Sequence, residues 1–248
     1  MPGRARPAIW KLRLHNTVKK CNSGVTIIQE YFGERAMGTA SEGVSEWVDG
    51  FLFVANRPIL DFLNTKPVLA EGPTELLPDV HAWERWLIAS GIAASPKTRS
   101  LLKSWRSSPE AASFLEELIG FRERLRSAVM KIESGSLPSD SFLAEVNSLL
   151  LQYPVRTSLH KQNGKIHRDV IFEPRKPSDF WVPIADAAAD LLSETETSRL
   201  RQCESCVVHF FDTSKKGSRR WCSMNICGNK LKVAAYQRRK RAREGSEE

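Results

Sequence analysis

Apolar residues recur at every third or fourth position over much of the middle of the chain, which is the period of an amphipathic helix. The segment 109–133 shows this spacing most clearly, at Phe114, Leu118, Phe121, Leu125 and Val129. Ser95 and Ser108 each stand before a proline, so a capping hydroxyl precedes a residue suited to the first helical position. The pattern predicts helices over about 78–91, 96–106, 109–133, 139–152 and 181–194.

Strand signals are fewer than helix signals. The segment VRTSLHKQNGKIHRDVIFEP, residues 155–174, offers two extended runs around Asn163-Gly164, the dipeptide preferred by tight type I′ hairpins. The segment FLFVANRPILDFLNT, residues 51–65, predicts a short apolar strand, a turn at Arg57-Pro58 and a buried turn of helix. The fold class is therefore predicted to be α+β and helix-rich.

These segments divide the chain into four predicted parts. Residues 1–45 lack sustained periodicity and are expected to form a flexible basic extension. A helix-rich domain with a β-hairpin follows at 46–196, then a small four-cysteine module of hairpin and basic helix at 197–243, and an acidic tail at 244–248. A chain of 248 residues, 41% of them hydrophobic, is long enough for one medium domain and a small module.

The hydropathy pattern also bears on where the protein works. No window approaches the roughly 18 consecutive apolar residues of a membrane span. The first residues lack the apolar run and small-residue cleavage site of a secretory signal. We therefore expect a cytoplasmic protein without membrane contact, in which clustered cysteines indicate a metal before a disulfide.

The positive charge of the chain is unevenly distributed. The net charge is +8, but residues 37–198 carry seventeen Lys/Arg against twenty-two acids. Residues 199–243 carry thirteen Lys/Arg against only Glu204 and Asp212, a net charge of +11. An acidic middle joined to a basic end is expected when that end meets a polyanion.

Four of the five cysteines lie within CESCVVHFFDTSKKGSRRWCSMNICGNK, residues 203–230. They are spaced as Cys203-x2-Cys206, fifteen residues, then Cys222-x4-Cys227. The first gap and the intervening length are typical of four-cysteine zinc sites, although the second gap is wider than usual. Four thiolates fill a tetrahedral zinc and leave no position for water, which predicts one structural Zn²⁺. The alternatives are reduced buried cysteines, two disulfides, or His209 replacing one thiolate.

The expected fold of this module is a hairpin. VVHFFD and RRWC would pair across a turn at Lys216-Gly217-Ser218 and return Cys222 to the first two cysteines. Cys227 would lie at or just before the next helix, where free backbone amides favour a thiolate. Phe210, Phe211 and Trp221 are expected to form a small hydrophobic core beside the metal.

The segment after Cys227, GNKLKVAAYQRRKRAR, predicts a helix with a dense basic face. Such a row can contact phosphates, and Arg219 and Arg220 would widen the patch. Asn229 and Gln237 are the candidates for base edges. The predicted nucleic-acid-binding residues are Arg219, Arg220, Asn229, Lys230, Lys232, Arg238, Arg239, Lys240, Arg241 and Arg243. The alternative is a solvated basic tail.

The cysteine segment resembles the CGNR zinc finger: it has CxxC followed by FDTSKKGSRRWCSMNICGN, with the RRWCSM and CGN signatures in order. Lys230 stands where that motif has Arg, which keeps the charge but loses the planar fork. Upstream, RPILDFLNT, residues 57–65, resembles the ABATE domain that precedes this finger in bacterial stress-induced transcription regulators. The resemblance spans about 50–243 and implies zinc at the four cysteines, nucleic-acid binding by the C-terminal module and a bacterial source.

The remaining polar residues give weaker signals. Asp61, Asn64 and Thr65 could bind a small ligand, or could cap a buried helix and satisfy local backbone groups. No phosphate-cradling glycine loop or nucleophile elbow is visible, so we expect no enzyme. The favoured function is a zinc-dependent DNA-binding transcriptional regulator, cytoplasmic and nucleoid-associated, whose N-terminal domain senses an effector or forms a homodimer. RNA binding and a zinc-stabilised protein-interaction adaptor are the alternatives.

Overall fold

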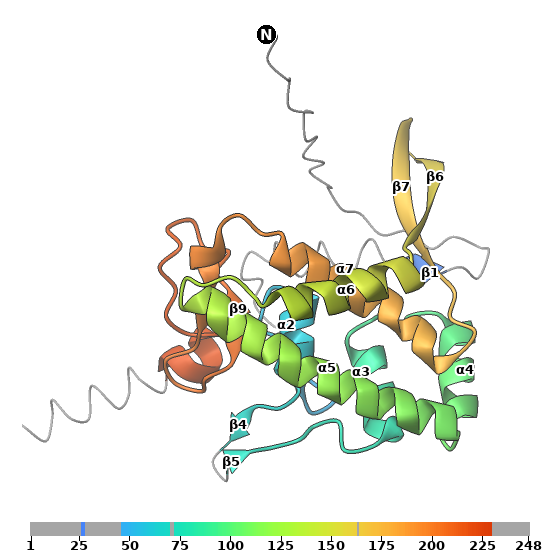
Figure 1. Ribbon diagram of the computed structural model, residues 1–248, viewed down its shortest axis with the longest axis horizontal. Coiled ribbons are helices and arrows are strands. Elements are labelled where there is room, and N and C mark those ends of the chain that lie inside the picture. The colour runs from blue at the N-terminus through green and yellow to red at the C-terminus, as the bar shows by residue number, and fades with distance from the viewer. Residues whose placement is uncertain (1–25, 28–45, 70–71, 163, 230–248) are drawn as a thin grey trace, which may run out of the picture.

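The computed structural model describes residues 26–27, 46–69, 72–162 and 164–229, and its ribbon is shown in Figure 1. Lys230, the predicted basic helix and the acidic tail lie outside the described residues. The longer helices are α2 (Pro58–Leu63), α3 (Val80–Ala89), α4 (Pro96–Trp105), α5 (Pro109–Glu133), α6 (Asp140–Gln152) and α7 (Trp181–Leu192). The helix-rich α+β fold predicted from the sequence is confirmed.

Four helices begin where the sequence places a capping side chain. Asp79 accepts a hydrogen bond from the backbone N–H of Ala82 at 2.8 Å, at the start of α3. Ser95, Ser108 and Ser139 accept the equivalent bond at the starts of α4, α5 and α6. Each of these side chains satisfies a backbone donor that has no partner within the helix. The predicted helix positions are correct to within a few residues because these signals are local.

The core of the helical domain lies around α5, which runs the length of the domain in Figure 1. Its apolar face buries Phe114, Leu118, Phe121 and Leu125, as the spacing predicts. Trp83 of α3 packs its ring edge against Phe180 with 5.2 Å between centroids, and Trp83 and Trp86 are both almost fully buried. These two tryptophans are core residues.

The long β-hairpin consists of β6 (Arg156–Gln162) and β7 (Lys165–Phe172), paired antiparallel. Gln162 pairs with Lys165, so the connection is the two-residue turn at Asn163-Gly164 that the sequence predicts. Gly164 has φ +71°, a conformation that a type I′ turn requires and that glycine adopts without a steric penalty. The hairpin projects from the body of the molecule (Figure 1).

Shorter strands complete the fold. The hairpins β2 (Trp47–Val48) with β3 (Phe51–Leu52) and β4 (Val68–Leu69) with β5 (Gly72–Pro73) flank α2 in sequence. Strand β1 (Thr26–Ile27) pairs with β7 at the base of the long hairpin, Thr26 opposite Phe172. The predicted flexible extension of residues 1–45 therefore contains one paired segment. The rest of 1–45, apart from this strand, lies outside the described residues.

The last described segment is the cysteine module, which we define as residues 197–229. It contains a 3₁₀ turn (Thr197–Arg199), β8 (Leu200–Gln202), β9 (His209–Phe211) and a π-helical turn (Met224–Gly228). Phe210 and Phe211 are buried and belong to the same contiguous hydrophobic cluster as the core of the helical domain. The small separate core expected for this module is therefore an extension of the main one.

Candidate metal centre

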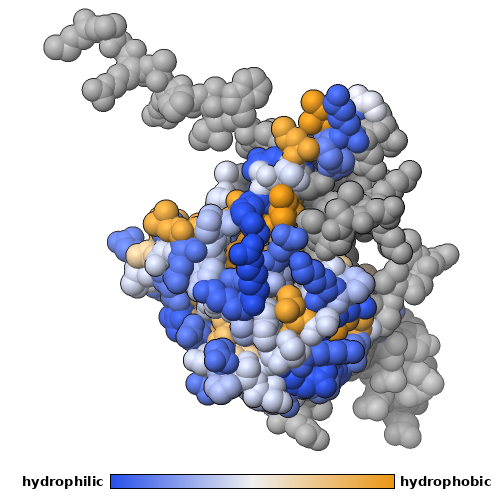
Figure 2. Space-filling model, turned by 90° about the vertical axis from the view of Figure 1, so that its right-hand side faces the viewer, coloured by the Kyte–Doolittle hydropathy of each residue, from blue (hydrophilic) through white to orange (hydrophobic). Residues whose placement is uncertain are grey.

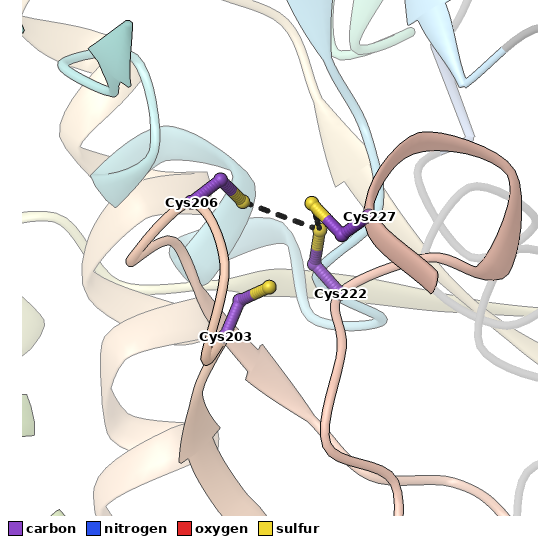
Figure 3. Close-up of side chains that lie close together, drawn as sticks. All are labelled: Cys203, Cys206, Cys222 and Cys227. Atoms are coloured by element: carbon purple, nitrogen blue, oxygen red, sulfur yellow. Dashed lines mark hydrogen bonds between the residues drawn. The ribbon is translucent and has the colours of Figure 1, made fainter. Parts of the chain in front are cut away.

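Cys203 and Cys206 lie in the tight connection of the β8–β9 hairpin. The N–H of Cys203 donates to the carbonyl of Val208 at 2.8 Å, and the N–H of Val207 donates to the carbonyl of Cys203 at 3.1 Å. Val207 has φ +54°, a left-handed conformation that is strained for a β-branched residue. This knuckle turns both sulfurs toward one point (Figure 3).

Cys222 and Cys227 reach the same point from a different element. The N–H of Glu204 donates to the carbonyl of Arg220 at 3.2 Å, which holds the segment before Cys222 beside the knuckle. The Ser223 hydroxyl accepts from the N–H groups of Asn225 and Ile226 and begins the π-helical turn that contains Cys227. Cys227 thus lies inside a short helical turn, and the helix that the sequence predicts directly after it falls outside the described residues.

The predicted pairing of VVHFFD with RRWC is wrong. β9 pairs instead with β8, the strand that precedes the first cysteine, with Leu200 opposite Phe211. The segment from Thr213 to Ser223 contains no strand. Residues 200–202 carry no clear strand signal of their own, and β9 is also hydrogen-bonded to Ala55 and Asn64, which lie far from it in the sequence.

The four sulfurs form one cluster, with all four lying within 4.8 Å of one another. The Sγ atom of Cys222 is 3.5 Å from that of Cys206 and 3.6 Å from that of Cys227 (Figure 3). Four sulfurs at about 2.3 Å from a tetrahedral zinc would stand about 3.8 Å apart. Since Cys203, Cys222 and Cys227 are buried and Cys206 is half-buried, the donor set fits one structural Zn²⁺ without a water ligand.

The thiols shift one another's protonation. Hydrogen bonds from Cys206 and Cys222 lower the pKa of Cys203. The bond to Cys203 raises the pKa of Cys206 to about 12, and the same partner raises the pKa of Cys222. All four can be thiolates at neutral pH when a divalent cation neutralises them, so metal binding there releases protons.

Arg219 supports the cluster from inside the module. Its Nε donates to the carbonyl of Trp221 at 2.7 Å, and its guanidinium lies 4.9 Å from the centroid of the Phe210 ring. Burial lowers the pKa of Arg219, while the neighbouring Cys222 and Asp212 act to raise it. A zinc with four thiolates carries a net charge of −2, which this half-buried cation partly balances. The prediction that Arg219 contacts nucleic acid stays a prediction, although its Nε is engaged within the module.

Arg220 and Asn229 are exposed, as a contact residue should be. Arg220 pairs with Glu204 through two bonds, at 2.7 Å and 2.5 Å. Asn229 ends the π-helical turn and donates its N–H to the carbonyl of Met224. The other predicted contacts lie outside the described residues: Lys230, Lys232, Arg238, Arg239, Lys240, Arg241 and Arg243.

Asp212 organises the loop between β9 and Cys222, and the sequence analysis gave it no role. The buried carboxylate accepts from the N–H of Ser214 at 2.9 Å and from the N–H of Arg219 at 2.7 Å. Burial acts to raise the pKa of Asp212, but these hydrogen bonds hold it below its usual range. The Asp-Thr-Ser sequence carries the signal, since an aspartate often accepts from the N–H two residues later.

The residues named as a possible ligand site make hydrogen bonds inside the fold. The Asp61 carboxylate accepts from the N–H of Ala55 at 3.0 Å. The Thr65 hydroxyl donates to the carbonyl of Phe62 and accepts from the guanidinium of Arg122, which is fully buried. These contacts fit the alternative of local backbone satisfaction for Asp61 and Thr65, while ligand binding by Asp61, Asn64 and Thr65 stays a prediction.

Asn64 has a different task, because it clamps the cysteine module to the helical domain. Its Nδ2 donates to the carbonyl of His209 at 2.8 Å, and its Oδ1 accepts from the N–H of His209 at 3.0 Å. Nδ1 of His209 lies 2.8 Å from a carboxylate oxygen of Glu133, at the end of α5. His209 is thus a strand residue outside the thiol cluster, and its backbone and ring are both held by the helical domain.

Further contacts join the cysteine module to the helical domain. The N–H of Phe211 donates to the carbonyl of Ala55 at 2.8 Å, and Nδ2 of Asn56 donates to the carbonyl of Phe211 at 2.9 Å. The Arg57 guanidinium lies 4.4 Å from the centroid of the Phe211 ring. A groove of about 780 Å³ opens where the end of α5 meets the module, and Glu133, Arg201 and Arg220 are among its lining residues.

The fold and the four-thiol centre define a helical domain joined to a zinc finger, and comparison with known families agrees. The CGNR zinc finger model matches residues 199–240. The ABATE model, described as "Putative stress-induced transcription regulator", matches residues 56–195, more than half of the chain. The chain belongs to the ABATE family. No curated protein matches it.

In the described part of the chain, no helix is both long enough and apolar enough to cross a bilayer.

Proposed function

We propose that the protein is a zinc-dependent DNA-binding transcriptional regulator whose C-terminal basic segment contacts DNA. The observation that carries the proposal is the four-thiol cluster, which fixes the start of the most basic segment of the chain. Residues 199–243 have a net charge of +11. A segment of this charge releases counterions from a phosphate backbone, which gives strong, salt-dependent affinity. The family description supports a role in transcription.

The zinc centre and the helical domain have different roles in this proposal. The zinc has no position for a substrate, so it serves to fold the module and not to catalyse a reaction. We propose no enzymatic activity. The helical domain supplies the second function of a regulator, sensing an effector or forming a homodimer. If a small effector binds, the groove between α5 and the module offers it room beside the finger.

The proposal is tested by changing Arg238, Arg239 and Arg241 together to Ala. We expect this variant to bind all duplex DNA more weakly, with the slope of log K against log salt concentration reduced by about one for each phosphate that the segment no longer neutralises. The matched control changes three exposed lysines of the helical domain, Lys97, Lys103 and Lys131, to Ala. Zinc content should be unchanged in both variants.

The alternatives predict different outcomes of the same titration. If the triple arginine variant binds DNA as tightly as the parent at every salt concentration, the basic segment is not the DNA surface and the adaptor function is favoured. If the parent prefers single-stranded or A-form RNA in competition with duplex DNA, the RNA-binding function is favoured.

A further inference from the structure

The long hairpin exposes apolar side chains that lie outside the hydrophobic core. We call β6 and β7 together, residues 156–172, the ribbon. Leu159 is 71% exposed and Ile166 is 69% exposed. In the antiparallel register Leu159 is opposite Arg168 and Lys161 is opposite Ile166, so these four residues share one face of the ribbon. This face alternates large apolar groups with cations.

The ribbon is locally basic within an acidic domain. Residues 156–172 carry four Lys/Arg against Asp169. The surrounding stretch 37–198 has more acids than bases. The ribbon projects from the body (Figure 1), and in the space-filling view hydrophobic and hydrophilic side chains lie together on the projection (Figure 2). A polyanion is therefore attracted to the ribbon more than to the domain that carries it.

The opposite face of the ribbon keeps it ordered without using Leu159 or Ile166. His160 and His167 form a cross-strand pair with their rings stacked at 5.5 Å between centroids. Cross-strand pairs of this kind stabilise a two-stranded ribbon. The exposed apolar pair lies outside the hydrophobic core, and apolar side chains exposed in this way are expected where they serve an interface.

We propose that the ribbon is a second nucleic-acid-contacting element, which enters a groove of duplex DNA. A two-stranded ribbon fits the major groove, and apolar side chains on such elements also wedge between base steps in the minor groove. Lys161 and Arg168 contact the phosphates that border the groove. The proposal rests on the proposed function, because it assumes that the same DNA is held by the finger.

The ribbon lies toward the opposite end of the molecule's long axis from the cysteine module (Figure 1). A duplex that reaches both elements must therefore be longer than one that reaches only the finger. The affinity of the parent should rise with duplex length, and the rise should come from the ribbon. DNA on which the ribbon inserts side chains should also be bent.

The test compares two double variants of the ribbon with a matched control in the full chain. Leu159→Ser with Ile166→Ser removes the apolar pair, and Lys161→Gln with Arg168→Gln removes the cations. The control, Leu137→Ser with Leu151→Ser, removes two apolar side chains that are 86% and 84% exposed elsewhere. Binding is measured on a short and a long duplex across a salt titration, and bending by energy transfer between the ends of the long duplex.

We expect the apolar variant to lose roughly tenfold in affinity for the long duplex and to abolish the bend, with binding to the short duplex unchanged. The cation variant should reduce the salt slope on the long duplex by about two. The control should behave like the parent. Circular dichroism and zinc content identify any variant that has failed to fold, and Leu159→Thr with Ile166→Thr, which keeps strand propensity, then takes its place.

Two outcomes overturn the proposal. One is a ribbon variant that binds and bends the long duplex as the parent does. The other is sedimentation showing that the parent is a dimer and the apolar variant a monomer with unchanged DNA binding, which makes a second copy of the chain the occupant. If the proposed function itself is wrong, the triple arginine variant binds DNA as tightly as the parent. That result is distinct from both outcomes that overturn the ribbon proposal.

Discussion

The two hairpins of this protein are built in opposite ways. The ribbon has fifteen strand residues, projects from the body and exposes Leu159 and Ile166. The hairpin of β8 and β9 has six strand residues, and all three residues of β9 are buried. Beyond its base, where β1 pairs with β7, the ribbon is specified by its own turn and cross-strand pairs, whereas the short hairpin depends on the thiol cluster and on α2. One can therefore be altered locally, and the other only together with its surroundings.

The largest effect should come from breaking the metal centre. Changing Cys222 to Ser removes a buried ligand, and metal binding of this kind supplies about 10 kcal/mol or more of folding free energy. We expect loss of zinc, unfolding of the cysteine module and a lower melting temperature for the helical domain, since both share one hydrophobic cluster. Differential scanning calorimetry with metal analysis measures this. If the helical domain melts as in the parent, the contacts between the cysteine module and the helical domain do not stabilise that domain.

The next largest effect should come from removing Asn64, which clamps the cysteine module to the helical domain. Changing Asn64 to Ala leaves the backbone N–H and C=O of His209 buried without their partners. We expect a loss of about 2–4 kcal/mol in the free energy of unfolding. The exposed Asn147 on α6 provides the matched control, whose change to Ala should cost less than about 0.5 kcal/mol. Urea denaturation of both variants decides whether the clamp matters.

A smaller effect should be confined to the ribbon. Changing Gly164 to Ala places a Cβ at φ +71° and should cost about 1 kcal/mol in the ribbon alone. Hydrogen exchange should become faster across β6 and β7, while the rate of zinc transfer to a chelator stays that of the parent. Faster zinc transfer would mean that the two hairpins are coupled.

The smallest effect should be a gain in the free energy of unfolding, obtained at Val207. Val207 holds a left-handed conformation in the knuckle and is 41% exposed. Changing it to Asn, which tolerates this conformation better, should raise the free energy of unfolding by about 0.5–1 kcal/mol. Changing Val182 of α7 to Asn serves as a control, because a helical conformation gives no such gain. Equal effects at the two positions would remove the strain argument.

The differences between the hairpins also decide what the sequence could predict. Asn163-Gly164 and the capping residues of the helices act locally, so the ribbon and α3 to α6 follow from short segments. The four thiol ligands were predictable because their spacing is itself the signal. The pairing of β9 was not, because it depends on Ala55 and Asn64, about 150 positions earlier in the chain.

The same limit applies to polar residues. From the sequence alone Asn64 is a candidate for binding a ligand, and only its contact with His209 in the structure shows a structural role. Asp212 carried a local signal that was overlooked, since its Asp-Thr-Ser sequence favours an Asx turn. Arg219 adds charge to a basic segment in the sequence, and only the structure shows that its guanidinium lies against the Phe210 ring.

The central claim is that zinc on four thiolates keeps the cysteine module folded, and that the folded module is bound to the helical domain through the contacts of β9 with Ala55, Asn64 and Glu133. It is tested most directly by hydrogen exchange with and without a zinc chelator, beginning from protein whose zinc content has been measured. We predict one zinc per chain. On its removal, amide protection should be lost at His209 to Phe211 and reduced at Ile59 to Leu63 of α2, while β6 and β7 keep theirs. Protein purified without chelator that contains no zinc, or an α2 whose protection is unchanged when the zinc is removed, would contradict the claim.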